Sequence, residues 1–257
     1  MLLYNYHVRK IEIIKTKITV TDKAHLISLI KEETELNGNN CSLNHIDVSK
    51  VTDMSYLFYK STFNGDISQW DVSNVVNMQY MFNAGKFNKD ISKWDVSKVC
   101  NMVGMFSQSN FNQDISKWNV SSVTNMDSMF AKSKFNQDIS RWDVSSVEDM
   151  SYMFYKSIFD QDILSWDVSS VGNMEAMFAH SKLNQDLTGW APKKLIYKDE
   201  VFDGSKLEQK QNLPYWATVD IEFLQQAINA CQLQKQLNTE LRSTLIEKPF
   251  NSNLVKI

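Results

Sequence analysis

The sequence contains few cysteines, which cross-link small secreted domains, and few glycines and prolines, which interrupt regular structure. Its 257 residues include three cysteines, seven glycines and three prolines. Cys41, Cys100 and Cys231 are odd in number and far apart, which argues against a disulfide framework. No apolar run approaches the ~20 residues that a membrane-spanning helix needs. The N-terminus also lacks the apolar stretch of a secretory signal, so we expect a cytoplasmic protein.

What the sequence does contain is a long internal repeat. Tryptophan recurs at intervals of 24 residues, which divides 47–190 into six units without insertion or deletion. The shared pattern is D-V-S-x-V-x-[ND]-M-x-x-M-F-x-x-[SG]-x-F-N-x-D-I-S-x-W. A unit of this length is too short to bury its own apolar face, whereas stacked copies bury a continuous core. The repeat therefore predicts a tandem stack of units.

Two kinds of apolar spacing occur within each unit. Val75, Met78, Met81 and Phe82 lie three or four residues apart, which predicts one or two helical turns with a buried face. The following F-N-x-D-I-S-x-W alternates between apolar and polar residues, which predicts a short strand. The expected fold is an α/β repeat protein whose strands form a parallel sheet along the stack.

The D-V-S-x-V-x-N-M-x-x-M-F…F-N-x-D-I-S-x-W unit resembles that of the BspA-like leucine-rich-repeat family of bacteria. The resemblance covers 47–190 and implies a leucine-rich-repeat-like solenoid with a binding role. Several members of this family are surface or secreted proteins. The resemblance therefore also implies an alternative function, that of an adhesin at the cell surface that binds host proteins.

The flanking segments are expected to close the stack. Residues 1–46 are predicted to form an N-terminal cap, with a strand, a helix over 23–36 and a half repeat. Residues 191–216 keep the 24-residue register imperfectly and are predicted to be a degenerate seventh unit that caps the other end. Residues 217–257 form a C-terminal tail with a predicted helix over 218–247. This segment either folds back on the cap, docks on a partner or a second copy of the chain, or is disordered.

One column of aspartates recurs once per unit. Carboxylates about 5 Å apart repel one another unless each has hydrogen-bond donors. A row of Ca²⁺ sites is one interpretation, but the glycines of calcium-binding β-rolls are absent. We favour a structural role, in which each carboxylate accepts hydrogen bonds from backbone N–H groups or serines within its own turn. The column consists of Asp66, Asp90, Asp114, Asp138, Asp162 and Asp186.

Residues with catalytic or metal-binding chemistry are scattered. The four histidines have no metal-ligand spacing with cysteine or with one another. The sequence contains no nucleotide-binding glycine motif and no nucleophile elbow. We therefore predict a protein that is not an enzyme and that uses no cofactor and no metal.

Variable side chains on a rigid repeated frame form a natural binding surface. We predict a non-catalytic protein–protein interaction scaffold that binds an unidentified partner protein through its strand face. Nucleic acid is a less favoured partner, because the aspartate columns oppose a polyanion. Self-association through 218–247 is a further alternative. The predicted protein-binding residues are Lys89, Lys93, Gln113, Lys117, Gln137 and Arg141.

Overall fold

The computed structural model of the chain describes residues 16–209, 213–218, 230 and 232–237. The chain divides into two compact units, Met1–Pro214 and Tyr215–Ile257. The first contains β1 (Ile18–Thr19), α1 (Lys23–Asn37), β2 (Ile46–Asp47) and α2 (Lys206–Gln209). The second contains α3 (Tyr215–Thr218). The helix predicted over 218–247 lies largely outside the described residues, and with it the predicted self-association.

At the N-terminal end, α1 lies where the sequence predicted a helix. It begins after Asp22, whose carboxylate accepts a hydrogen bond from the backbone N–H of His25 at 2.9 Å. It ends at Gly38, whose φ of 78° suits a residue without a side chain. The helix buries Leu26 and Ile30. Beside it, β1 and β2 form a two-stranded parallel sheet.

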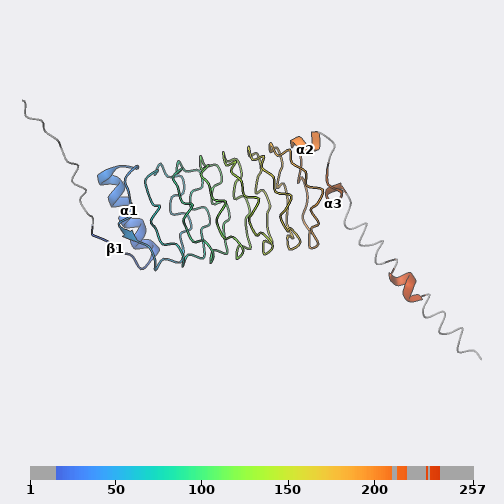
Figure 1. Cartoon of the computed structure of the whole chain (residues 1–257), viewed down its shortest axis with the longest axis horizontal. Coiled ribbons are helices and arrows are strands. Elements are labelled where there is room, and N and C mark those ends of the chain that lie inside the picture. The colour runs from blue at the N-terminus through green and yellow to red at the C-terminus, as the bar shows by residue number, and fades with distance from the viewer. Residues whose placement is uncertain (1–15, 210–212, 219–229, 231, 238–257) are drawn as a thin grey trace, which may run out of the picture. The chain divides into compact units, whose positions relative to one another are not determined.

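The 24-residue units lie next to one another in a stack between α1 and α2 (Figure 1). Contrary to the predicted α/β repeat, no helix or strand is present in residues 48–205, all of which the structure describes. The predicted helical turns are instead consecutive tight turns, in which Met81 N–H bonds the Met78 carbonyl and Gly85 N–H bonds the Phe82 carbonyl. Tyr80 and Ala84 lie at the third positions of these turns, and both have a φ of 52°. The spacing of three and four residues fits these turns as well as a helix.

One part of each unit bonds its neighbour through the backbone. We call it the backbone-paired segment, which is 76–86 in the second unit and the equivalent residues elsewhere. The N–H groups of Met78, Tyr80 and Phe82 bond carbonyl groups of the next unit at 2.8–3.0 Å. Single parallel bridges link Asn77 to Asn101 and continue at the same position through the stack. The predicted parallel sheet is thus reduced to isolated bridges, and they lie in a different segment from the predicted strand.

Another part of each unit bonds its neighbour mainly through side chains. We call it the side-chain-paired segment, which is 88–94 in the second unit and the equivalent residues elsewhere. The backbone N–H of Asn112 bonds the side-chain oxygen of Asn88 at 2.9 Å, and that of Asn88 bonds Asn64 at 2.8 Å. Trp94 donates its indole N–H to the backbone carbonyl of Ile67 at 3.2 Å. These contacts repeat in the following units, so side chains replace the missing strand pairing.

The core is a set of apolar columns that run along the stack. Phe82, Phe87 and Trp94 are at most 4% exposed, as are their counterparts in the other five of the six repeats. The ring of Phe82 stacks on that of Phe106, with 5.6 Å between centroids. Stacking continues past 190, where Phe178 meets the buried Phe202. The seventh unit therefore covers the end of the repeated core with its own apolar side chains.

Candidate functional site

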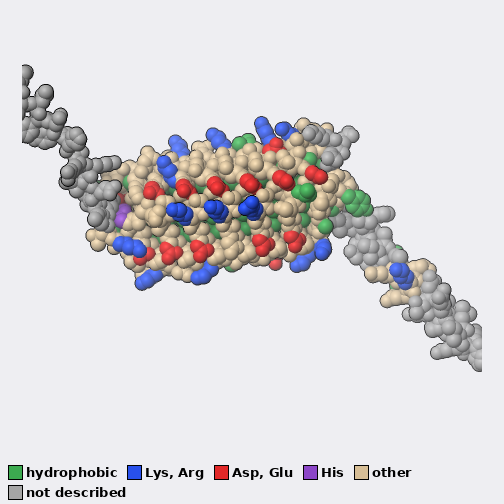
Figure 2. Space-filling view, viewed as in Figure 1, with side chains coloured by type: hydrophobic (Ala, Val, Ile, Leu, Met, Phe, Trp, Pro, Cys, Tyr) green, Lys and Arg blue, Asp and Glu red, His purple; other side chains and the backbone are tan. Residues whose placement is uncertain are grey.

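Rows of charged side chains run along the stack (Figure 2). In the predicted aspartate column, each carboxylate accepts the backbone N–H of the residue two positions later at 2.8–2.9 Å. A second row shows the same geometry, and its hydrogen bonds measure 2.9–3.2 Å. The second row consists of Asp47, Asp71, Asp95, Asn119, Asp143 and Asp167. We call these the first and second aspartate rows.

These hydrogen bonds favour the ionised carboxylates. The backbone N–H of Ser92, aided by its hydroxyl and by Lys93, holds the pKa of Asp90 below its usual value. The pKa values of Asp114 and Asp138 are lowered in the same way. In the second row, the Ser49 hydroxyl and backbone N–H lower the pKa of Asp47 to about 2. These aspartates therefore carry their charge at neutral pH.

The six predicted binding residues do not behave alike. Lys93, Lys117 and Arg141 are exposed and occupy the same position in three consecutive units, three residues after the first aspartate row. Their charges lower the pKa values of the neighbouring aspartates, so the positive and negative groups lie close together. We call this surface the striped face; it comprises these three residues and the two aspartate rows.

The other three predicted residues share a different position in the unit. Lys89 is exposed. Gln113 and Gln137 are half-buried, and their amide groups donate to Asn88 and Asn112 at 3.1 and 3.2 Å. These two glutamines therefore extend the bonding between units rather than point freely outward. The asparagine ladder that they join was not predicted, although the F-N pair shows asparagine at this position in five of the six repeats, with Asp160 in the fifth.

A groove of about 520 Å³ lies over the backbone-paired segments. Five tyrosines line it, and we call it the tyrosine groove: Tyr56, Tyr59, Tyr80, Tyr152 and Tyr155. Its middle is lined by the small residues Ser107, Ser128 and Ala131. This groove was not predicted from the sequence. A signal was present, because tyrosines occur in the same two variable positions of the first and fifth units.

The tyrosines contact one another and neighbouring charges. Tyr56 lies 5.1 Å from Tyr80 and 5.6 Å from Tyr59, measured between ring centroids. At the other end of the groove, the ammonium groups of Lys132 and Lys156 lie 5.5 and 4.9 Å from the centroid of the Tyr155 ring. These distances are typical of cation–π contacts. The groove thus has an aromatic surface at both ends and lysines beside it.

Acidic groups lie next to the same groove. The Tyr152 hydroxyl donates to Glu175, and this bond raises the pKa of Tyr152 to about 12. Burial raises the pKa of Asp127, and the nearby charges of Asp149 and Glu175 add to this effect. The hydroxyl of Ser128, which lines the groove, donates to Asp127 at 2.8 Å. Acidic side chains of three neighbouring units therefore meet here. Asp149 accepts the backbone N–H of Ser151 at 2.8 Å, whereas Asp127 accepts hydroxyl groups from Ser128 and Ser151.

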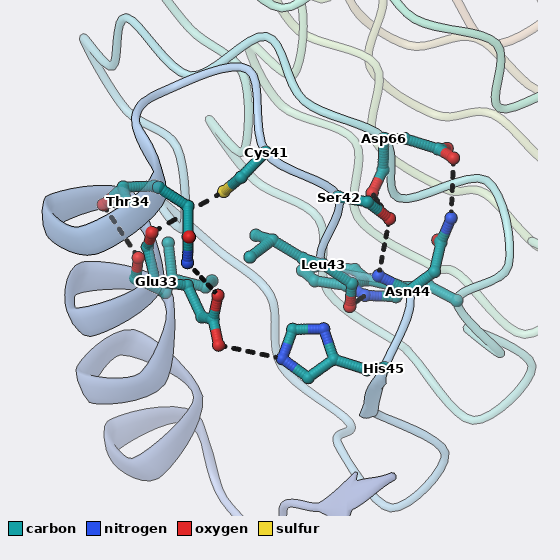
Figure 3. A network of polar contacts seen from close by, with 11 residues as sticks. Glu33, Thr34, Cys41, Ser42, Leu43, Asn44, His45 and Asp66 are labelled. Atoms are coloured by element: carbon teal, nitrogen blue, oxygen red, sulfur yellow. Dashed lines mark hydrogen bonds and ion pairs between the residues drawn. The ribbon is translucent and has the colours of Figure 1, made fainter. Parts of the chain in front are cut away.

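A separate polar network joins α1 to the first unit (Figure 3). His45 lies 3.0 Å from the carboxylate of Glu33, and both side chains are largely buried, at 8% and 16% exposed. Asn44 donates to Asp66 at 2.7 Å, and the indole N–H of Trp70 donates to the Leu43 carbonyl. This network attaches the cap to the stack. It indicates a structural role for His45.

Metal-binding clusters and membrane-spanning helices are both absent from the described residues. No group of three or more histidine, cysteine, aspartate or glutamate side chains in this part of the chain is arranged to hold a metal ion. Within the same part, no helix is both long and apolar enough to cross a membrane.

The comparison with protein families identifies the chain. The model of the family described as "Mycoplasma protein of unknown function, DUF285" matches residues 25–134, 84–158 and 133–241, which together span most of the chain. The chain belongs to this family. The three overlapping DUF285 matches confirm its tandem-repeat character, whereas they do not single out the BspA-like type. No curated protein and no solved structure matched the chain.

Proposed function

We propose that the chain is a non-catalytic protein–protein interaction scaffold with a solenoid architecture of the BspA-like type. The striped face is the proposed binding surface. The observation that carries this proposal is the row of Lys93, Lys117 and Arg141, which lies exposed beside carboxylates that are held in place by their own turns.

Fixed charges on a stiff frame favour specific recognition of another charged surface. The Asp90, Asp114 and Asp138 carboxylates need no reorganisation on binding, because a backbone N–H already orients each one. Complementary charges mainly raise the association rate and exclude wrong partners. A polyanion meets repulsion from both aspartate rows, whereas a protein surface with mixed charges matches the stripes.

Charge reversal at the row tests the proposal. The triple variant Lys93→Glu, Lys117→Glu, Arg141→Glu changes the net charge by the same amount as Lys86→Glu, Lys134→Glu, Lys182→Glu. The second set lies in a different exposed row and serves as the matched control. Proteins captured from a lysate of the producing cells by the wild-type chain are compared quantitatively with those captured by each variant.

The proposal expects a set of partners that the control variant retains and the striped-face variant loses. Rising salt is expected to weaken capture by the wild type, because the contacts are exposed charges. Equal capture by both variants contradicts a role for the striped face. Loss of capture in both variants to the same extent shows a dependence on net charge alone and also contradicts it.

A further inference from the structure

The tyrosine groove has the features of a second binding site, and its residues are independent of the striped face. Its aromatic side chains gather at two ends. Tyr56 and Tyr59 are 49% and 41% exposed, although each carries a large apolar ring. Tyr80 and Tyr152 occupy the same position in units that are three repeats apart, so the two ends are about 14 Å apart at ~4.8 Å per repeat.

The backbone beneath the groove is already fully used in bonding between units. The N–H groups of Tyr80, Gly104 and Ser128 each bond a carbonyl of the next unit at 2.8 Å. A ligand therefore finds no strand edge to extend, and recognition rests on side chains. Tyrosine rings, tyrosine hydroxyls and the Gln108 amide supply apolar faces and hydrogen-bonding groups along the groove.

The small residues between the two ends allow a narrow chain to lie close to the surface. Between the tyrosines of the two ends, the groove is lined by the small side chains of Ser107, Ser128 and Ala131 together with Gln108 and Lys132. A polyproline II segment suits such a site because it has no internal hydrogen bonds and is stiff before binding. Proline-rich segments dock in aromatic-lined grooves for the same reason. At ~3.1 Å per residue, about five residues span the 14 Å between the aromatic ends.

The acidic side chains beside the groove favour a ligand with a positive charge over a neutral sugar. Asp127 and Glu175 lie next to Tyr152, and Asp149 adds a third negative charge. Among the described residues, no lysine, arginine or histidine lies within ion-pair distance of these three acids. A cationic ligand side chain at this end relieves the mutual repulsion of the acids, which an uncharged sugar does not.

We propose that the tyrosine groove binds an extended, proline-containing peptide segment of a partner protein. Prolines about five residues apart stack on the tyrosines at the two ends, and a lysine or arginine of the peptide lies beside Asp127 and Glu175. The peptide carbonyls accept hydrogen bonds from the side-chain amide of Gln108 and from tyrosine hydroxyls other than that of Tyr152, which already donates to Glu175. This proposal stands without the striped face, because the two surfaces come from different segments of the unit.

Fluorescence polarisation with designed peptides tests the proposal on the full chain. The probes are labelled twelve-residue peptides of alanine and proline, with two arginines at either the first or the last positions. Matched probes carry glutamate in place of arginine or glycine in place of proline. A neutral chitohexaose competitor tests the alternative that the groove takes a sugar.

Tyr152→Asn is the groove variant. Residue 152 has a φ of 55°, and asparagine tolerates this region of backbone conformation. Tyr80→Asn provides an independent second variant at the other end of the groove. Tyr197→Asn is the matched control, because residue 197 is exposed, lies outside the groove and has asparagine at the equivalent position of four other units. Thermal unfolding of each variant verifies that it is folded.

We expect one of the two arginine peptides to bind, and binding to weaken about tenfold in each groove variant, as loss of a stacked aromatic contact implies. The control and the striped-face triple variant are expected to bind like the wild type. Absence of binding by both arginine peptides overturns the proposal. So does equal binding of the glutamate or glycine peptides, undiminished binding by both groove variants, or displacement of the peptide by chitohexaose.

Discussion

The two bonding segments of each unit differ in what their sequence must supply. In the backbone-paired segment, peptide groups join neighbouring units, so side chains there are free to vary. The position of Gln79, for example, is occupied by Val103, Asp127 and Glu175 in other units. In the side-chain-paired segment, asparagine and tryptophan make the bonds between units, and these residues recur in almost every copy. Apart from the buried core columns, which recur in both segments, a side chain therefore recurs where it bonds the neighbouring unit and varies where the backbone makes that bond.

The largest expected effect comes from the tryptophan column. Trp118 is 3% exposed and donates to the Ile91 carbonyl at 3.1 Å. We expect Trp118→Ala to reduce the free energy of unfolding by about 3–5 kcal/mol, mainly through the cavity, because the Ile91 carbonyl keeps its bond from the backbone N–H of Trp94. Urea unfolding measures the loss. Trp118→Phe keeps an aromatic ring but loses the donor and part of the ring system, so its cost is expected to be smaller, about 1–3 kcal/mol. If Trp118→Ala destabilises the chain less than Trp118→Phe does, the structural role of this column is contradicted.

A smaller effect is expected from the asparagine ladder. Asn112 accepts the backbone N–H of Asn136 at 2.8 Å and the Gln137 amide at 3.2 Å. Asn112→Leu leaves that N–H without a partner and is expected to cost about 1–3 kcal/mol in urea unfolding. Asn112→Asp keeps the acceptor, as Asp160 does at the equivalent position.

The matched change in the backbone-paired segment is Gln79→Val. Valine occurs at the equivalent position 103, and the bonds between units there do not use this side chain. Its cost is expected to stay within about 0.5 kcal/mol. If Gln79→Val destabilises the chain as much as Asn112→Leu, the distinction between the two segments fails.

The turns of the backbone-paired segment carry a conformational cost that glycine removes. Gln108 has a φ of 56°, which is unfavourable for a residue with a side chain. Gln108→Gly is therefore expected to raise the free energy of unfolding by about 1 kcal/mol. The reverse change, Gly104→Ala, brings a methyl group within 2.2 Å of the Tyr80 ring and is expected to destabilise the chain. Stabilisation by both changes, measured by urea unfolding, contradicts the turn geometry.

The smallest expected effects concern pH. The folded pKa of Asp114 lies below its ordinary value because the backbone N–H and hydroxyl of Ser116 stabilise the carboxylate. A lowered pKa stabilises the folded state above the unfolded pKa of about 4, and this contribution is lost as pH falls through the folded value. Asp114→Asn keeps an acceptor, as Asn119 does in the second row. Urea midpoints of this variant are expected to fall less than those of the wild type between pH 7 and pH 3.

Asp127 is expected to affect stability in the opposite direction to Asp114. Its pKa is raised by burial and by neighbouring acids, so its ionisation opposes folding at neutral pH. Asp127→Asn is expected to raise the urea midpoint at pH 7, and the gain is expected to shrink as pH falls through the raised folded pKa and to vanish below the unfolded value of about 4. A larger gain at pH 3 than at pH 7 contradicts this assignment.

The sequence was sufficient for the features that depend on periodicity. The 24-residue spacing predicts that the side chains of Met78, Phe82 and Trp94 face the core. The equivalent side chains are buried in all six repeats. The cap helix was also visible, since Asp22 and Gly38 delimit it.

Other features depend on contacts between stacked units, which the local sequence pattern does not encode. A positive φ at Tyr80 and Ala84 runs against local preference, and bonds to the next unit hold both residues there. This is why helical spacing was a wrong guide to the secondary structure. The tyrosine groove likewise requires residues of the first to the fifth units to line one surface, and the recurrence of tyrosines in the first and fifth units is the one trace of it in the sequence.

Residue-resolved amide hydrogen exchange of Asn112→Leu tests the division between the two segments most directly. In the wild type, the amide of Asn136 bonds the Asn112 side chain, whereas the amide of Gln108 bonds the backbone carbonyl of Ala131. The account predicts that the variant loses protection at Asn136 while Gln108 keeps it. Unchanged protection at Asn136, or an equal loss at both amides, would contradict the claim that side chains hold one part of each unit and the backbone holds the other.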